Sequence, residues 1–190
     1  MRGFLRNLLG DFLQFEGGDY GNNSSVTQVK DSNGDYTVEF FFNFDTVSGN
    51  NGILGITQTS TLRGLVVLYN ASYFEVYNYA NGTHSASQYN TPTLSTLGIT
   101  TSRWYHITIR IDNSTDIKIY VDGLLKATST GNAGGTPWLS TSGLRIGSIQ
   151  TLGYPVNGKV GNLKIYQGLL SDEQVAQNYL ATKNKYPNGI

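Results

Sequence analysis

The sequence predicts an all-β protein made of two antiparallel sheets packed as a sandwich, with one short helix near the C-terminus. Apolar and polar residues alternate over about a dozen short segments, as they do in strands with one buried face. Asn-Gly and Asp-Gly pairs separate several of these segments and are strong hairpin signals. A helical pattern with a capping signal follows the last of the segments.

The first residues carry an apolar stripe with helix-like spacing ahead of the first strand. Residues 1–12 are therefore predicted to form an N-terminal arm, and residues 13–190 one domain, because no repeat or linker divides the rest of the chain. The arm either packs on its own domain or docks on a neighbouring chain. In the second case a homo-oligomer would form through Phe4, Leu5, Leu8 and Leu9.

Residues 36–44 give the clearest strand pattern. Val38, Phe40, Phe42 and Phe44 share one face, and four large apolar side chains on one face indicate a deep core. Further strands are expected at residues 13–15, 53–57, 64–69, 73–79, 104–111, 117–121, 144–149 and 159–166 and from residue 124 onward, with loops at residues 16–25, 90–101 and 130–142.

Two local signals predict specific backbone geometry. Asp122-Gly123 lies between alternating segments and predicts a type I′ turn, which needs positive φ at both central residues. Ser171 and Gln174 have the spacing of a capping box, so a helix is expected over residues 172–183. Pro187 prevents any continuation of that helix.

Several of these segments resemble a known family when they are taken together. The stretches RWYHITIRID, IKIYVDG and LRIG, and the closing stretch GKVGNLKIYQGLLSDEQVAQNY, resemble the laminin-G-like branch of the concanavalin A-like lectin/glucanase superfamily. The resemblance covers nearly the whole chain and implies a jelly-roll sandwich. It implies no single function, because family members include lectins, adhesion domains, glycoside hydrolases and virion surface parts. The ending NYLATKNKY is similar to laminin-G-like proteins of tailed bacteriophages.

Catalysis is not predicted. The resemblance implies that a hydrolase of this superfamily would carry carboxylates at alternate positions of one strand, where they share a face. None of the four glutamates has an acidic residue two positions away: Glu16, Glu39, Glu75 and Glu173. A glycoside hydrolase is therefore the least favoured function.

No cofactor is expected from the sequence, although calcium is left open. The chain has no cysteine and its two histidines are far apart, so a zinc site is not expected; His106 is predicted to be structural and His84 to be solvated. Calcium prefers oxygen ligands, and Asp-rich loops occur at residues 31–35, 45–51 and 112–116. The Asp residues in these loops equally suit turns.

Tyrosine and tryptophan are the candidate ligand-binding residues. Each offers a flat apolar face with a polar tip, which suits a sugar ring, although such residues are also enriched in subunit contacts. Tyr73, Tyr77 and Tyr79 are expected on the outward face of one strand. Trp138, beside Pro137 in a glycine-rich loop, is the strongest single candidate. The predicted binding residues are Trp138, Tyr154, Tyr89, Tyr77 and Tyr79.

The sequence therefore predicts a non-catalytic carbohydrate-binding or adhesion protein, exposed on a phage virion or extracellular. The alternative is a purely structural capsid decoration or tail-fibre subunit, anchored to virion proteins by its arm. The 13 basic and 13 acidic residues balance, and no basic stripe indicates nucleic acid. No run approaches the ~18 apolar residues of a membrane span, and no signal peptide is evident.

Overall fold

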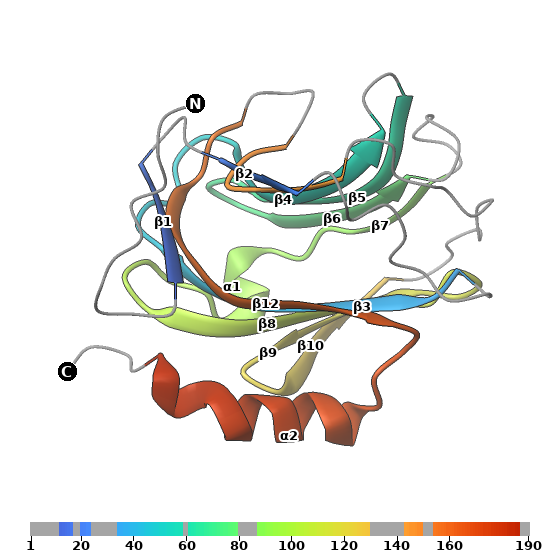
Figure 1. The fold of residues 1–190 in the computed structure, drawn as a ribbon. Helices are drawn as coiled ribbons and strands as arrows, with labels where there is room; N and C mark the ends of the chain where they lie inside the picture. The colour runs from blue at the N-terminus through green and yellow to red at the C-terminus, as the bar shows by residue number, and fades with distance from the viewer. Residues whose placement is uncertain are drawn as a thin grey trace.

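Two six-stranded antiparallel sheets form the protein, and a helix covers one of them (Figure 1). The computed structural model describes residues 12–16, 20–23, 34–58, 61–79, 87–129, 143–149 and 154–186. Sheet 1 contains, in spatial order, β1 (Phe12–Glu16), β12 (Asn157–Gln167), β3 (Tyr36–Phe44), β8 (Trp104–Ile111), β9 (Ile117–Val121) and β10 (Leu124–Thr128). Sheet 2 contains β2 (Gly21–Asn23), β11 (Leu144–Ile146), β4 (Asn51–Gln58), β5 (Thr61–Tyr69), β6 (Phe74–Tyr79) and β7 (Ser87–Asn90).

The hydrophobic core lies between the two sheets. The inward residues of β3, Val38, Phe40, Phe42 and Phe44, are all 0% exposed, as their alternation predicts. Across the core, the Tyr69 ring centroid lies 4.8 Å from that of Phe44. Each large apolar side chain that is fully buried contributes about 1.5–3 kcal/mol, so this layer holds the sandwich together.

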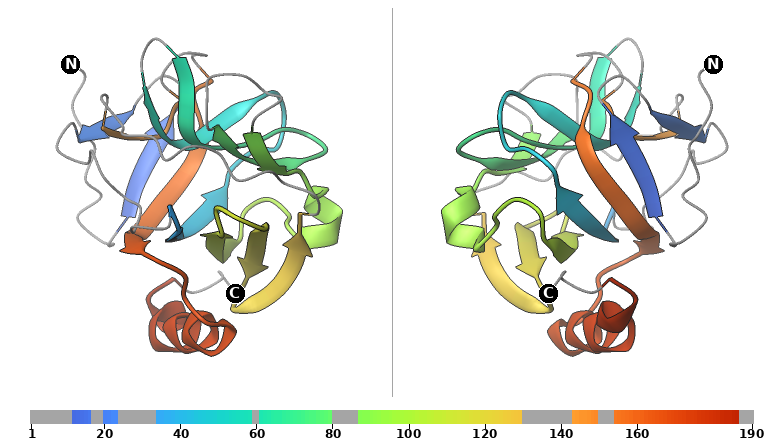
Figure 2. Two further views of the ribbon diagram at one scale, coloured as in Figure 1. Left: turned by 90° about the vertical axis from the view of Figure 1, so that its right-hand side faces the viewer. Right: turned by 90° about the vertical axis from the view of Figure 1, so that its left-hand side faces the viewer.

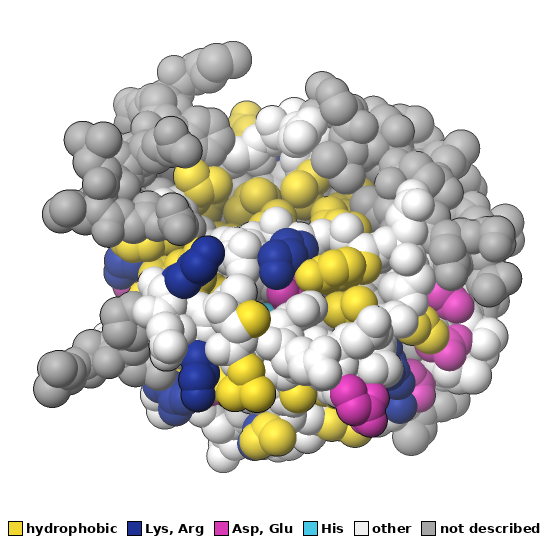
Figure 3. Space-filling view, turned by 60° about the horizontal axis from the view of Figure 1, so that its bottom comes forward, with side chains coloured by type: hydrophobic (Ala, Val, Ile, Leu, Met, Phe, Trp, Pro, Cys, Tyr) yellow, Lys and Arg dark blue, Asp and Glu magenta, His cyan; other side chains and the backbone are white. Residues whose placement is uncertain are grey.

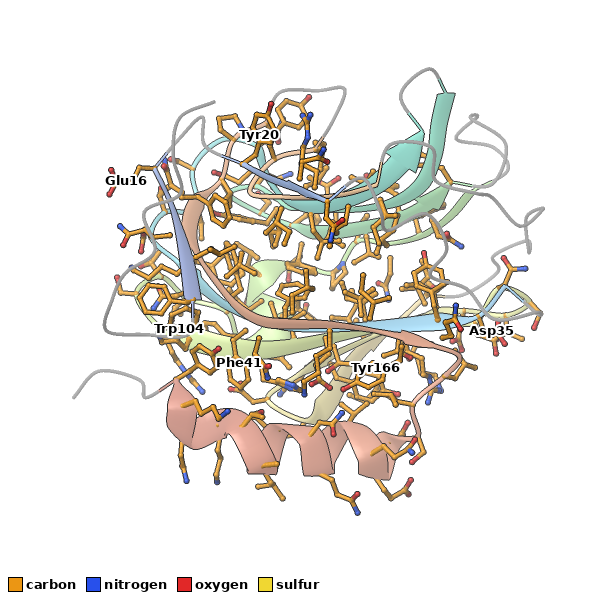
Figure 4. All side chains as sticks on the ribbon, in the orientation of Figure 1. Glu16, Tyr20, Asp35, Phe41, Trp104 and Tyr166 are labelled. Atoms are coloured by element: carbon orange, nitrogen blue, oxygen red, sulfur yellow. The ribbon has the colours of Figure 1, made fainter. Side chains whose placement is uncertain are left out.

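The outward face of β3 is buried as well, which the sequence pattern alone did not indicate. Helix α2 (Asp172–Thr182) and the 3-10 turn η2 (Lys183–Lys185) lie against the outer side of sheet 1, as the two side views in Figure 2 show. Tyr186, just after η2, stacks on Phe41 with ring centroids 4.2 Å apart. Figure 4 shows Phe41 and Tyr166 pointing from sheet 1 toward this helix.

A buried polar cluster lies between α2 and sheet 1. The carboxylate of Glu39 accepts hydrogen bonds from Lys164 Nζ at 3.1 Å and from Asn178 Nδ2 at 2.8 Å. The His106 imidazole is 3.6 Å away. Burial alone would raise the pKa of Glu39, but the His106 imidazole, the Asn178 amide and the Lys164 ammonium outweigh it and lower that pKa. Glu39 is therefore held as a carboxylate inside the protein.

The two predicted local signals are confirmed. Asp122 and Gly123 have φ values of 53° and 78°, as a type I′ turn requires. The Ser171 hydroxyl accepts from Gln174 N, and the Gln174 side chain accepts from Ser171 N, which completes the capping box. Acidic residues Asp172 and Glu173 begin the helix, where they favour its dipole. Figure 3 shows most of the acidic side chains of this face toward the right of the view, with basic side chains at the left, in the centre and beside those acids.

Three short elements lie within segments that were predicted as loops or left unassigned. They are β2, β7 and the one-turn helix α1 (Leu94–Leu97), which is capped by Thr93. In addition, β1 begins at Phe12, so the helix-like stripe cannot run through Phe12 and Leu13 as its spacing suggested. The rest of the arm, with Phe4, Leu5, Leu8 and Leu9, lies outside the described residues, and its role stays a prediction.

We predict that Gly123→Ala destabilises the protein more than Gly49→Ala. Both glycines have positive φ, +78° and +70°, which costs alanine about 1–2 kcal/mol. A Cβ on Gly123 would also lie 3.2–3.3 Å from Tyr179 and Ala176 of α2, whereas one on Gly49 would meet no atom within 4 Å. Urea unfolding should therefore show roughly 1 kcal/mol of additional loss for Gly123→Ala. Equal losses would contradict the close packing of α2 on this turn.

We also predict that Glu39→Gln weakens the dependence of stability on pH. Because the pKa of Glu39 is lower in the folded protein, its ionised carboxylate stabilises the fold at pH values above its unfolded pKa of about 4.3. This stabilisation is lost as the pH falls through the pKa of the folded protein. At neutral pH the substitution should cost about 1.5–3 kcal/mol, typical of hydrogen bonds to a charged group. Thermal unfolding of the wild-type protein and of Glu39→Gln between pH 7 and about 3 checks this prediction. A difference in stability between the two proteins that stays constant across that range would contradict it.

Candidate ligand-binding surface

The candidate surface is the outer face of sheet 2 along β6 and β7. Alternation along β6 turns Phe74, Val76 and Asn78 into the core, where they are buried. The remaining side chains, Glu75, Tyr77 and Tyr79, therefore point away from sheet 1. The strand pattern of residues 73–79 predicted this division of faces.

Strand register places a third tyrosine beside this row. Tyr89 of β7 pairs with Tyr77, and Val66 of β5 pairs with Tyr77 on its other side. Directly opposite residues in an antiparallel pair have Cβ atoms about 4.5–5.5 Å apart and share a face. Tyr77, Tyr79 and Tyr89, which we call the tyrosine strip, are thus neighbours, and Tyr89 is 54% exposed.

The tyrosine strip rests on an apolar floor. The Tyr77 and Tyr79 rings are nearly parallel, with an angle of 6° and centroids 5.4 Å apart. Tyr79 is buried in a small cluster with Val66, Leu68 and Ile149, and Tyr77 and Tyr154 pack against that cluster. The floor packs against the rings of Tyr77 and Tyr79, so these two side chains have little rotamer freedom left to lose on binding.

Two glycines in β4 allow the segment around Ile149 to lie on the sheet. A Cβ on Gly52 would be 2.8 Å from Ile149 N and 3.0 Å from the Tyr154 carbonyl oxygen. Gly52 N instead donates a hydrogen bond to that oxygen at 3.0 Å. Gly55 lies under the Ile149 side chain at ordinary contact distance. The close approach at Gly52 brings Tyr154 to the same outer face as the tyrosine strip.

Glu75 supplies a carboxylate on the same strand face. Its Oε1 accepts a hydrogen bond from Asn70 Nδ2 at 2.6 Å, and its Oε2 accepts one from the Tyr77 hydroxyl at 2.5 Å. Burial, and then the hydrogen bond and charge of Glu75, raise the pKa of Tyr77. Burial and the same charge raise the pKa of Tyr79 to about 12. Both phenols are therefore protonated at neutral pH.

The structure brings together four of the five residues predicted to bind a ligand: Tyr77, Tyr79, Tyr89 and Tyr154. Trp138 lies outside the described residues, and the binding role of all five stays a prediction. Tyr79 is outward as expected but almost fully buried, because Tyr77 and the apolar floor enclose it. Sequence reasoning overlooked Glu75 as a site residue; its place between Tyr73 and Tyr77 in an alternating strand was the available signal.

The buried and surface carboxylates do not form a catalytic pair. Glu39 faces α2 on the outer side of sheet 1, whereas Glu75 lies on the outer side of sheet 2. Stacked sheets are about 10 Å apart, and both side chains point away from the interior, so their separation exceeds the 5–9.5 Å that glycoside hydrolysis uses. His106 packs between Phe41 and Tyr179, which is the structural role that was predicted.

Two Asp residues of the candidate calcium loops serve as a turn former and as an ion-pair partner, namely Asp112 and Asp45. Asp112 Oδ1 accepts hydrogen bonds from the Ser114 backbone, the Ser114 hydroxyl and the Thr115 backbone. Asp45 pairs with Lys159 at 2.9 Å. Within the described ranges, no group of three His, Asp or Glu side chains is placed to hold a metal. Residues 31–33 and His84 lie outside those ranges.

The chain belongs to the concanavalin A-like lectin/glucanases superfamily. A laminin-G-type family model with that description matches residues 16–176, which spans both sheets and the start of α2. The family resemblance noted in the sequence is therefore confirmed. A comparison with curated protein sequences gives no match.

Solved structures with the same fold include receptor-binding domains of botulinum neurotoxins. The serotype G binding domain superposes with a TM-score of 0.67 at 14% identity, over 90% of this chain and 42% of that chain. The neurotoxin DC binding domain, solved in complex with rat synaptotagmin II, gives 0.66 at 12% identity, over 93% and 44%. A type C structure, described with cell entry dependent on two ganglioside molecules, gives 0.65 at 11%, over 90% and 42%.

These similarities establish the fold of this chain. The protein spans less than half the length of the neurotoxin chains that it matches. No helix among the described residues is long and apolar enough to cross a membrane.

We predict that Gly52→Ala destabilises the protein far more than Gly55→Ala. The new methyl group at position 52 would press on backbone atoms of Ile149 and Tyr154, which cannot rotate away. At position 55 the nearest atom would be 3.6 Å away, in ordinary contact. Overpacking costs about 1–3 kcal/mol, so Gly52→Ala should lose that much stability in urea unfolding and Gly55→Ala less than about 1 kcal/mol. The reverse order would show that the segment does not lie on β4.

Proposed function

We propose that this protein is a non-catalytic carbohydrate-binding protein and that the tyrosine strip of sheet 2 is its binding surface. One observation carries the proposal: Tyr77, Tyr79 and Tyr89 gather on one strand face beside Glu75. Aromatic rings contact the apolar C–H face of a sugar, while phenols and carboxylates exchange hydrogen bonds with its hydroxyl groups.

The arrangement of the two outer faces supports this assignment. Helix α2 and Tyr186 cover the centre of sheet 1, so its outer face is occupied. The outward rings of β6 and β7 lie on the other layer, and Tyr89 at the edge strand is more than half exposed. The glutamates that could assist hydrolysis point away from each other on opposite layers, which supports binding without catalysis.

A structural role is the second candidate. Leu124 and Leu125 on β10, the edge strand of sheet 1, are 62% and 44% exposed, which favours a contact with another protein. Such a contact suits the capsid decoration or tail-fibre subunit considered from the sequence, anchored by its arm. Exposure on a virion or outside the cell stays a prediction from the sequence.

We predict that Tyr89→Ala abolishes or strongly weakens binding to glycans that the wild-type protein selects on a glycan array. Loss of the exposed ring should weaken binding at least about 10-fold, which corresponds to ~1.4 kcal/mol. Tyr20→Ala is the matched control: Tyr20 is 50% exposed but lies near β2 at the opposite edge of the same sheet, next to Arg145. Figure 4 shows Tyr20 on the outer side of sheet 2.

Two results would contradict the proposal. One is an array without any bound glycan, which would favour the structural role. The other is a Tyr89→Ala protein that binds as tightly as the wild type. Circular dichroism of both variants establishes that they are folded, because Tyr89 is largely exposed and its removal should change stability by less than about 1 kcal/mol.

A further inference from the structure

The Glu75 carboxylate has no cationic partner among the side chains that the structure describes, which do not include that of Arg63 on the neighbouring strand β5. Its two contacts, the Asn70 amide and the Tyr77 hydroxyl, are neutral donors. The five ion pairs of the described residues all involve other acids, namely Asp45, Asp122, Asp172 and, twice, Glu39. Neither β6 nor β7 contains a lysine or arginine. The negative charge of Glu75 is therefore not neutralised by its neighbours on these strands.

The aromatic rings add to this negative potential. The face of a tyrosine ring carries a negative quadrupole and attracts cations, with a gain of about 0.5–1 kcal/mol at exposed sites. Tyr77 stands next to Glu75 on one strand face, and Tyr79 and Tyr89 each stand beside Tyr77. Burial first, and then the nearby charge of Glu75, raise the pKa of both Tyr77 and Tyr79, so both rings stay neutral beside this carboxylate.

We propose that the tyrosine strip selects sugars that carry a positively charged amino group, that is, unacetylated amino sugars, over neutral sugars of the same shape. This inference rests on the proposed carbohydrate-binding function. Each oxygen of Glu75 already accepts one hydrogen bond, and an ionised carboxylate has about four acceptor positions, so acceptor capacity remains for an ammonium donor. A carboxylated sugar would instead meet a like charge and bind more weakly than a neutral one.

A pair of oligosaccharides that differ only in the amino group tests the inference. Binding of a glucosamine tetramer and of an N-acetylglucosamine tetramer would be measured by titration calorimetry at low salt. The first should bind about 3- to 30-fold tighter, the combined effect expected of one cation–π contact and one partly exposed ion pair. A sialylated oligosaccharide should bind more weakly than the neutral tetramer. Raised salt should reduce the preference, because exposed charge pairs are screened.

Two variants separate the charge of Glu75 from the shape of the site. Glu75→Gln removes the charge but keeps the size of the side chain and an oxygen that can accept from Tyr77 or Asn70, so the affinities for the two tetramers should become equal in this variant. Glu16→Gln removes the same charge from the exposed end of β1, outside the strip, and should keep the preference.

Equal binding of both tetramers by the wild-type protein would overturn the inference and leave carbohydrate binding intact. A preference that persists in Glu75→Gln, or tighter binding of the sialylated ligand, would overturn it as well. Absence of binding to both tetramers also overturns it. The proposed function itself fails if the glycan array is empty as well, or if Tyr89→Ala leaves glycan binding unchanged.

Discussion

Burial of strand β3 on both faces is the constraint on which the rest of the structure depends. Its inward phenylalanines fill the space between the sheets, and its outward residues Glu39 and Phe41 also need cover. Helix α2 and Tyr186 provide that cover at the end of the chain. Gly161 of β12 makes it feasible, because a Cβ there would lie 2.5 Å from the Tyr186 ring. The C-terminal residues are thus part of the sandwich and complete its layering.

The contact between α2 and sheet 1 is unusual because much of it is polar. Val175 is the one residue of α2 that is fully buried, so an apolar stripe does not account for the docking of the helix. Glu39 is hydrogen-bonded to α2 and β12 and has His106 Nε2 at 3.6 Å, yet His106 Nδ1 and the Thr108 hydroxyl have no hydrogen-bond partner among the described residues. A buried polar group without a hydrogen-bond partner costs about 1–3 kcal/mol of folding free energy. The carboxylate of Glu39, in contrast, has its hydrogen bonds and favours one position of the helix. The position of α2 therefore depends on the orientation of Glu39.

Much of this architecture could be predicted from the sequence because its signals are local. The alternation in β3 and β8, the Asp122-Gly123 turn and the Ser171 capping box each need only neighbouring residues. The strands β2 and β7 could not be predicted, because they have three and four residues and little apolar content. Strand β2 forms by pairing with β11, more than 100 residues away in the sequence, which no short window reveals, whereas β7 pairs with the preceding strand β6.

The candidate surface was predictable in composition but not in geometry. Tyr77 and Tyr89 could be identified as candidates from the sequence, but they are neighbours because of the register between β6 and β7. Tyr154 lies near them because its segment approaches Gly52 closely. In the sequence, Glu75 has no acidic neighbour, which argues only against a role in hydrolysis. A role in binding depends on the hydrogen-bond donors and aromatic rings around the carboxylate, and those neighbours are known only once the strands are paired.

The position of the candidate binding surface follows from which outer face of the sandwich is covered and which is exposed. Sheet 1 uses its outer face to anchor α2, so a ligand has to approach the other layer. On sheet 2, Ile149 occupies the region above β4 and leaves β6 and β7 beyond it. A monomer gains little stability from an exposed Tyr89 or from a carboxylate without a cation, because neither buries much apolar area nor completes an ion pair. Their combination on one strand face supports the recognition role that we propose, in which the charge of Glu75 sets the ligand preference.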